Sequence, residues 1–221
     1  MQRKAVVFYF DPISPYSWLA ANQIPEIEAH LPIQCDFVPV LFAGLLNAHG
    51  QKGPAEIAAK RRYTITDAMR WAAKLGIRFE GPPAHPFNPL KALRLCTAVE
   101  ATTARRRLAE EILNACWRDG LDITDEDVLI GLASKVELAG QTLLNESNSE
   151  PIKKALRDRT DLAIEQGVFG VPTFWVDSQI FWGNDRLPFL IEHLQGRLRV
   201  DHERLNSVLN RPRAADRPQS K

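Results

Sequence analysis

The sequence predicts an α/β fold in which a long helical segment separates two small groups of strands. Apolar runs of strand length lie near the two ends of the 221-residue chain, at residues 5–10, 33–38 and 173–182. Helical patterns and helix stop signals fill most of residues 44–166 instead. The order of these segments indicates that the two strand groups meet in one sheet.

The first group of elements is a strand–helix–strand unit. Six consecutive apolar residues at 5–10, followed by Asp11-Pro12, predict a strand buried on both faces. Ser14 or Ser17 can cap a helix that runs towards residue 30 and is interrupted or bent at Pro25. Alternating apolar residues at 33–38 predict a second strand, parallel to the first with a right-handed crossover.

The middle of the chain reads as helices separated by short loops. The longest pattern, 55–75, ends at Gly76, and Gly and Pro residues at 81–86 predict an irregular loop. The run Arg105-Arg106-Arg107 is interpreted as a solvated helix face. Further helices are predicted at 90–101, at 105–118, from Thr124 onwards and at 151–166.

Strands return at residue 168. Segments 173–176 and 179–182 are separated by Asp177-Ser178, the spacing of a two-residue hairpin, and a helix follows at 187–198. The order βαβ, helices, ββα is that of a thioredoxin-like fold with a large all-helical insertion. The predicted domains are residues 1–43 with 167–205 for the thioredoxin-like part, 44–166 for the insertion, and 206–221 for a polar, disordered tail.

Composition argues against several classes of partner. The formal net charge of +1 gives no electrostatic basis for binding nucleic acid or an anionic membrane. No apolar stretch reaches the roughly 20 residues of a membrane helix, and the N-terminal run is too short for a signal peptide. The scattered residues Cys35, Cys96 and Cys116 are interpreted as buried, reduced thiols, which predicts a cytoplasmic location. No histidine spacing indicates a metal site.

The turn Ser14-Pro15-Tyr16-Ser17 is the first candidate site. A strand, a turn and a helix N-terminus leave N–H groups that favour negative charge. In C-x-x-C redox enzymes this place holds a cysteine thiolate, but serine cannot form a disulfide, so dithiol chemistry is not expected here. A serine hydroxyl can still donate a hydrogen bond to the thiolate of another molecule.

The second candidate stretch contains Val171-Pro172, where a proline enters a strand. A cis bond would turn the Val171 backbone outward, where it could pair with an extended peptide. A trans proline in an edge strand is the alternative, and it is the commoner arrangement. Because the serine turn occupies the matching place in the topology, we predict the cis form.

Three motifs carry a resemblance that runs from about Val6 to Gly196. The sequence resembles the 2-hydroxychromene-2-carboxylate isomerases, which are grouped with the kappa-class glutathione transferases on the fold of the bacterial disulfide oxidoreductases. The matching stretches are Phe8-Tyr9-Phe10-Asp11 with Ser14-Pro15-Tyr16-Ser17, Phe169-Gly170-Val171-Pro172-Thr173, and Trp182-Gly183-Asn184-Asp185-Arg186-Leu187.

The resemblance implies a glutathione site. Ser14 matches the serine that hydrogen-bonds the glutathione sulfur and is the implied catalytic residue. Val171 matches the residue whose backbone pairs with the cysteinyl part. Asn184 and Asp185 match the pair that holds the γ-glutamyl group, although the same pair could serve as an ordinary cap for the following helix.

Weaker matches concern three further residues. Gln51 stands where the family has asparagine, and Lys60 falls at the position of a glutathione-binding lysine but could equally be a solvated helix residue. Asn88 matches a segment lining the substrate side, yet it could also cap the helix that follows Pro89, which we favour. Trp175 and Trp182 are interpreted as core or rim aromatics.

The implied function is a glutathione-dependent isomerase acting on a small aromatic substrate such as a 2-hydroxychromene-2-carboxylate, through thiolate addition, bond rotation and elimination. The resemblance also implies a homodimer. Two alternatives remain open: a kappa-class-like glutathione transferase or peroxidase, and a non-catalytic thioredoxin-fold protein that binds peptides along the Val171 edge.

Overall fold

The computed structural model describes residues 3–212 and is built on a four-stranded sheet with the order β2-β1-β3-β4. β1 pairs in parallel with β2 and antiparallel with β3, which confirms the predicted strand–helix–strand unit. Asp177 and Ser178 both have positive φ in the tight turn of the predicted hairpin. The strands are β1 (Lys4–Phe10), β2 (Ile33–Pro39), β3 (Thr173–Val176) and β4 (Gln179–Trp182).

The predicted first helix is interrupted, as expected. α1 (Pro15–Ala21) ends before α2 (Ile24–His30) begins, and Pro25 lies in the first turn of α2, where no helical hydrogen bond is lost. The other helices are α3 (Phe42–Ala48), α4 (Ala58–Leu75), α5 (Leu90–Ala98), α6 (Thr102–Trp117), α7 (Glu126–Lys135), α8 (Gly140–Ser147), α9 (Glu150–Glu165), α10 (Leu187–Leu194) and α11 (His202–Leu209), with 3₁₀ turns η1 (Pro54–Glu56) and η2 (Asn184–Arg186).

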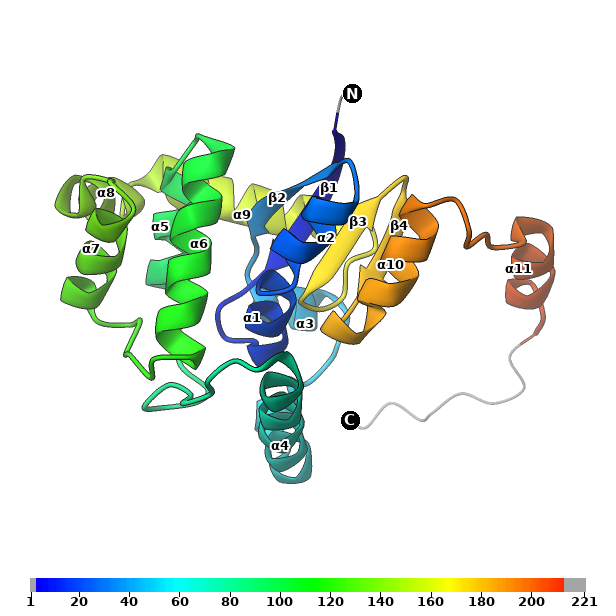
Figure 1. Cartoon of the computed structure of the whole chain (residues 1–221), viewed down its shortest axis with the longest axis horizontal. Helices are drawn as coiled ribbons and strands as arrows, with labels where there is room; N and C mark the ends of the chain where they lie inside the picture. Colours follow the sequence, from blue (N-terminus) through cyan, green and yellow to red (C-terminus); the bar gives the residue numbers. More distant parts are fainter. Residues whose placement is uncertain (1–2, 213–221) are drawn as a thin grey trace.

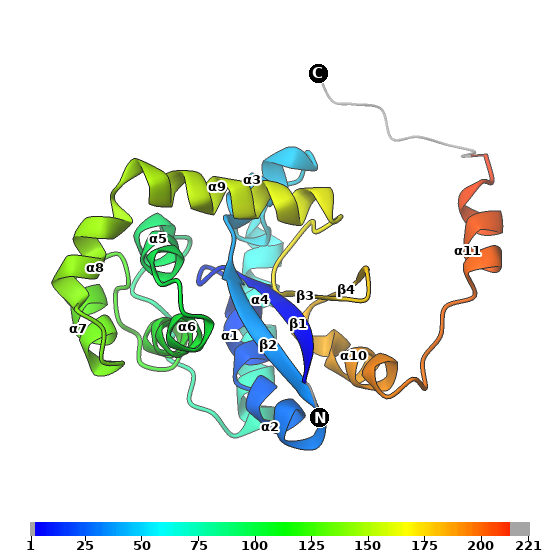
Figure 2. The ribbon, with the colours of Figure 1, turned by 90° about the horizontal axis from the view of Figure 1, so that it is seen from above.

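Helices cover both faces of the sheet. Successive side chains of β1 point to opposite faces, so this strand contributes to the packing on each. Val6, Phe8 and Phe10 pack into the larger core with residues of α1, α2 and α10. Tyr9 and Val7 belong to a second core that includes residues of α3 and α9. Figure 2 shows α9 and α3 on one side of the sheet and α2 and α10 on the other. The sheet therefore holds the C-terminal end of β1 firmly between two helical layers.

The helical insertion packs against β2 through α5, α6 and α9, and α5 to α8 form a group at one side of the sheet (Figure 1). One prediction in this region is wrong. Arg105 is 5% exposed rather than solvated, and its guanidinium donates to the Phe37 carbonyl at 2.9 Å and to Asp36 at 2.7 Å. A buried guanidinium needs such partners, and here β2 supplies them. Arg105 thus fastens the insertion to the sheet.

The last helix of the described chain, α11, runs past the predicted end of the thioredoxin-like part at residue 205. α11 continues to Leu209, past the expected start of a disordered tail at residue 206, and Asp201 caps it by accepting the N–H of Arg204. α11 stands apart from the sheet in Figure 1. The remainder of the predicted tail, residues 213–221, lies outside the described part of the chain. None of the helices within residues 3–212 has the length and apolarity needed to cross a membrane.

Candidate active site

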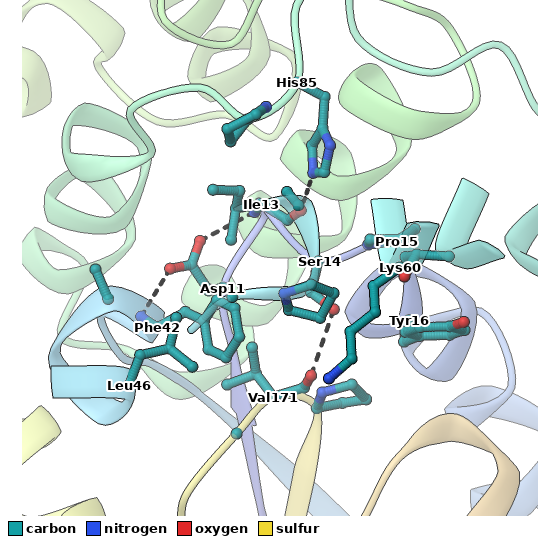
Figure 3. Close-up of a pocket in the computed structure, with 18 of the residues that line it drawn as sticks. Asp11, Ile13, Ser14, Pro15, Tyr16, Phe42, Leu46, Lys60, His85 and Val171 are labelled. Atoms are coloured by element: carbon teal, nitrogen blue, oxygen red, sulfur yellow. Dashed lines mark hydrogen bonds between the residues drawn. The ribbon is translucent and has the colours of Figure 1, made fainter. Parts of the chain in front are cut away.

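A cavity of about 820 Å³ opens beside the C-terminal end of β1. It is bounded by the turn after β1, by α4, by the loop before α5 and by the segment entering β3 (Figure 3). All of the site residues named from the sequence line this one cavity, although they come from segments far apart in the chain. They are Ser14, Gln51, Lys60, Asn88, Val171, Asn184 and Asp185.

Ser14 is the residue that caps α1. Its Oγ accepts the Ser17 N–H at 3.3 Å, and its backbone is extended, as an N-cap requires. The hydroxyl donates to the Val171 carbonyl at 3.4 Å, a long and therefore weak bond (Figure 3). The O–H group is thus available to a stronger acceptor in the cavity. Ser17 is fully buried and does not line the cavity.

Val171 faces Ser14 across the cavity floor. The Val171–Pro172 bond is cis, as predicted. The Pro172 carbonyl accepts the Gly183 N–H at 2.9 Å, which ties this segment to the one that carries Asn184. No acceptor for the Val171 N–H is found among residues 3–212. An unpaired N–H beside the cavity can donate a hydrogen bond to the backbone carbonyl of an extended ligand.

Asn184 and Asp185 begin the 3₁₀ turn before α10. Asn184 is only 3% exposed, and its buried Nδ2 has no hydrogen-bond partner within the described chain. Asp185 is half exposed and forms an ion pair with Arg186 at 2.7 Å. Gly183 has φ +108°, and a Cβ there would lie 2.5 Å from Asp185 Oδ1, so this position requires glycine. The turn therefore offers a buried amide donor and a carboxylate to the same cavity.

Lysines approach the cavity from the other side. The Lys60 side chain extends from α4 into the space in front of Val171 (Figure 3). Neither Lys60 nor the cavity-lining Lys52 takes part in an ion pair within the described residues. Gln51 lies on the same rim, where its N–H donates to the Leu46 carbonyl at 2.8 Å. These lysines add positive charge to the cavity that Asn184 also lines.

The remaining wall is apolar and aromatic. Trp71 of α4 and Phe87 of the loop before α5 line it, together with the half-exposed Trp182 at the rim. Asn88 Oδ1 accepts the Leu90 N–H at 3.0 Å, a contact at the start of α5, although the N-cap position itself is held by Pro89. Trp175 packs in the second core, away from the cavity.

Several titratable residues of the cavity escaped the sequence reasoning, and Asp11 and His85 are the two that contact the turn before Ser14. Asp11 is completely buried, and burial raises its pKa to about 7. His85 donates from Nε2 to the Ile13 carbonyl at 3.1 Å, and burial lowers the pKa of its ring. Asp11 was considered only as the end of a strand and as part of a matching motif, without a role of its own, and His85 only as part of a loop. A charged residue that directly follows a fully apolar strand was the available signal.

The cysteines take no part in this site. Cys35, Cys96 and Cys116 are all buried and free, which confirms the interpretation as buried thiols. Burial raises the pKa of each thiol, so they are unreactive near neutral pH. Across the described residues no cluster of His, Cys, Asp and Glu could hold a metal ion.

Comparison with known proteins agrees with the fold. Residues 5–195 match the family of the DSBA-like thioredoxin domain. A 2-hydroxychromene-2-carboxylate isomerase from Sphingobium xenophagum is 34% identical over 197 residues, covering 86% of this chain and 98% of the relative. Glutathione S-transferase kappa 1 from Rattus norvegicus is 27% identical, with 85% and 89% of the two chains covered.

A solved structure of a 2-hydroxychromene-2-carboxylate isomerase superposes with a TM-score of 0.80 at 26% identity, covering 94% of this chain and 100% of that one. This chain belongs to the 2-hydroxychromene-2-carboxylate isomerase family, whose members share the DsbA-like thioredoxin fold and are related to the kappa-class glutathione transferases.

Proposed function

We propose that this protein is a glutathione-dependent isomerase that acts on aromatic substrates of the 2-hydroxychromene-2-carboxylate type. The observation that carries the proposal is the convergence of residues from distant segments on one cavity, with the Ser14 hydroxyl at its floor. Relatives named as 2-hydroxychromene-2-carboxylate isomerases from three bacterial sources support the reaction class.

The polar groups of the cavity fit glutathione, a tripeptide-like ligand with two carboxylates, an amino group and a thiol. The unpaired N–H of Val171 suits the backbone of the cysteinyl part. The orphaned Nδ2 of Asn184 and the carboxylate of Asp185 suit the α-carboxylate and α-amino group of the γ-glutamyl part. Lys60, with Gln51 beside it, supplies charge and hydrogen bonds for the remaining carboxylate.

Ser14 is the catalytic residue of the proposal. When bound, glutathione supplies a thiolate nucleophile for reversible addition to and elimination from a conjugated carbonyl compound. The Ser14 hydroxyl stabilises the thiolate by donating a hydrogen bond, since its present bond to the Val171 carbonyl is long. Lowering a thiol pKa by one unit needs about 1.4 kcal/mol, and one hydrogen bond to a charged group contributes roughly 1.5–3 kcal/mol.

The aromatic wall accounts for the proposed substrate class. Trp71 and Phe87 give flat apolar surfaces on which a fused aromatic ring can stack. Asn88 stands beside Phe87, but its Oδ1 is occupied by the Leu90 N–H, so only its amide N–H groups remain for a substrate oxygen.

The reaction is tested by following a 2-hydroxychromene-2-carboxylate spectrophotometrically with the purified protein, with and without glutathione. Isomerisation should require glutathione and leave the amount of free thiol unchanged. S-methylglutathione is the matched control, because it should fill the site without supplying a thiol and should therefore support no turnover. Absence of turnover with saturating glutathione would contradict the proposal.

A second candidate is favoured by the kappa-class relatives from rat, human and nematode. In this alternative the same thiolate is consumed, either by conjugation to an electrophile or by peroxide reduction. Titration of free thiol during the reaction separates the two functions, because only the transferase lowers the concentration of glutathione.

We further propose a cytoplasmic homodimer. The reduced state of Cys35, Cys96 and Cys116 supports a reducing compartment, and the dimer rests on the family resemblance. Light scattering coupled to gel filtration should give the mass of two chains, and a single-chain mass at working concentrations would contradict the dimer.

A further inference from the structure

The turn that presents Ser14 is held by a buried carboxylate. Asp11 Oδ1 accepts the Ile13 N–H at 3.0 Å, and Asp11 Oδ2 accepts the Phe42 N–H at 3.0 Å (Figure 3). The Asp11 carbonyl also accepts the Ser14 N–H at 3.1 Å. One side chain thus links the end of β1, the turn and the first residue of α3.

The carbonyl groups of the same turn are held from the helical insertion. Trp117 of α6 donates from Nε1 to the Pro12 carbonyl at 2.8 Å. His85 donates from Nε2 to the Ile13 carbonyl at 3.1 Å, and because a carbonyl only accepts, this nitrogen carries the hydrogen. The peptide groups on both sides of Ile13 are therefore fixed, and Ser14 follows directly.

Burial of the Asp11 carboxylate costs the folded state free energy. It is completely buried, and no cation forms an ion pair with it within residues 3–212. Burial raises its pKa to about 7, although the two N–H groups oppose the shift. On α6 the buried Cys116 thiol faces it, and burial followed by the Asp11 charge raises the pKa of that thiol. An unpaired buried carboxylate at a cavity points to function, since local rules of folding are broken mainly at functional sites.

We propose that Asp11 is the positioning residue of this site: its ionised carboxylate, by accepting the N–H groups of Ile13 and Phe42 together, sets the turn that aims the Ser14 hydroxyl into the cavity. This inference rests on the proposed function for the identity of the ligand that Ser14 faces. Protonation of Asp11 turns one oxygen into a hydroxyl that donates and is a weaker acceptor, so the hydrogen bond from one of the two N–H groups weakens and the turn relaxes.

The test compares Asp11→Asn with Asp125→Asn. Asparagine keeps the shape of the side chain but replaces one acceptor oxygen by a donor group. Asp125 is the matched control, because it also accepts two N–H groups, from Asp127 and Val128, at the exposed start of α7. Asparagine caps helices as well as aspartate does, so the control should behave as the wild type.

The first readout uses the full-length protein without ligand. Backbone amide chemical shifts of Ile13, Ser14 and Phe42 are followed by NMR from pH 5 to 9. In the wild type and in Asp125→Asn these three signals should titrate together with a midpoint of about 7, and in Asp11→Asn they should not titrate. Ile13 and Phe42 signals that move independently of each other in the wild type would overturn the inference, even if Asp11→Asn does not fold, because a single carboxylate would then not accept both N–H groups.

The second readout is the thiol pKa of bound glutathione, measured from thiolate absorbance. Asp11→Asn should lower the thiolate fraction at fixed pH about tenfold, which is one pKa unit, while the glutathione Kd changes less than about threefold. An unchanged thiol pKa in Asp11→Asn overturns the positioning role. If the wild type binds no glutathione, the proposed function fails, and the amide titration still decides the role of Asp11.

Discussion

Replacing Asn184 by alanine probes the least expected feature of the cavity, a buried amide without a partner. Asn184 is 3% exposed and its Nδ2 makes no hydrogen bond with the described residues. A buried donor left unsatisfied costs about 1–3 kcal/mol. Asn184→Ala should therefore leave the free energy of unfolding unchanged or raise it by up to about 1–3 kcal/mol, because the removed amide N–H satisfies nothing in the free protein.

Glutathione binding, in contrast to stability, should be weakened by Asn184→Ala. A hydrogen bond from an amide to a carboxylate contributes about 1.5–3 kcal/mol, and its loss corresponds to a roughly 10- to 150-fold weaker Kd. Calorimetric titration of the wild type and Asn184→Ala with glutathione measures this ratio, and urea denaturation confirms that both are folded. Asn206→Ala, at an exposed position of α11, should bind as the wild type does. A Kd for Asn184→Ala within twofold of the wild type would refute the assignment of this amide to the ligand.

Three more predictions follow from single contacts. Ser17→Ala should be neutral or stabilising by up to about 1–3 kcal/mol in urea denaturation. The buried Ser17 Oγ has no partner in the described chain, and Ser14 provides the cap. A clear loss of stability would contradict this. Asp185→Ala should weaken glutathione binding by no more than roughly fivefold, because exposed ion pairs contribute about 0.2–1 kcal/mol and this carboxylate is half exposed beside Arg186. A loss of affinity of two orders of magnitude in calorimetry would contradict this prediction. Burial raises the pKa of Asp11 from 3.8 to about 7, so the folded state retains a proton that the unfolded chain releases. The free energy of unfolding should then fall between about pH 4 and 7 by on the order of 4 kcal/mol relative to Asp11→Asn, and parallel pH profiles of the two proteins would argue against it.

Much of the fold was predictable because the strands are short, strongly patterned and bounded by clear stop signals. The run at residues 5–10 is apolar throughout because β1 is central and covered on both faces. The hairpin spacing at Asp177-Ser178 and the stop at Gly76 rest on local backbone conformations that the sequence reveals directly. The cavity residues followed from motifs that the topology brings to one end of the sheet.

The errors arose where a residue's environment is made by distant segments. Arg105 sits in a basic run that reads as solvated, yet β2 supplies two of its acceptors, the Phe37 carbonyl and the Asp36 carboxylate. Asp11 looks like an ordinary strand end until the first residue of α3 closes over it. His85 gains its role only when its loop reaches the Ile13 carbonyl. Local sequence contains no information on such contacts. The helix α11 was missed because its eight residues have no buried member.

The central claim, that the Ser14 hydroxyl faces the thiolate of bound glutathione, is tested most directly by the thiol pKa of the complex. Thiolate absorbance is followed against pH for the wild type, Ser14→Ala and Ser17→Ala, each saturated with glutathione. The wild type should bind glutathione with a thiol pKa below that of the free tripeptide. Ser14→Ala should raise this pKa by roughly one unit or more, and Ser17→Ala, whose hydroxyl lies outside the cavity, should leave it unchanged. A shift in Ser17→Ala without one in Ser14→Ala would contradict the account and assign the sulfur to Ser17.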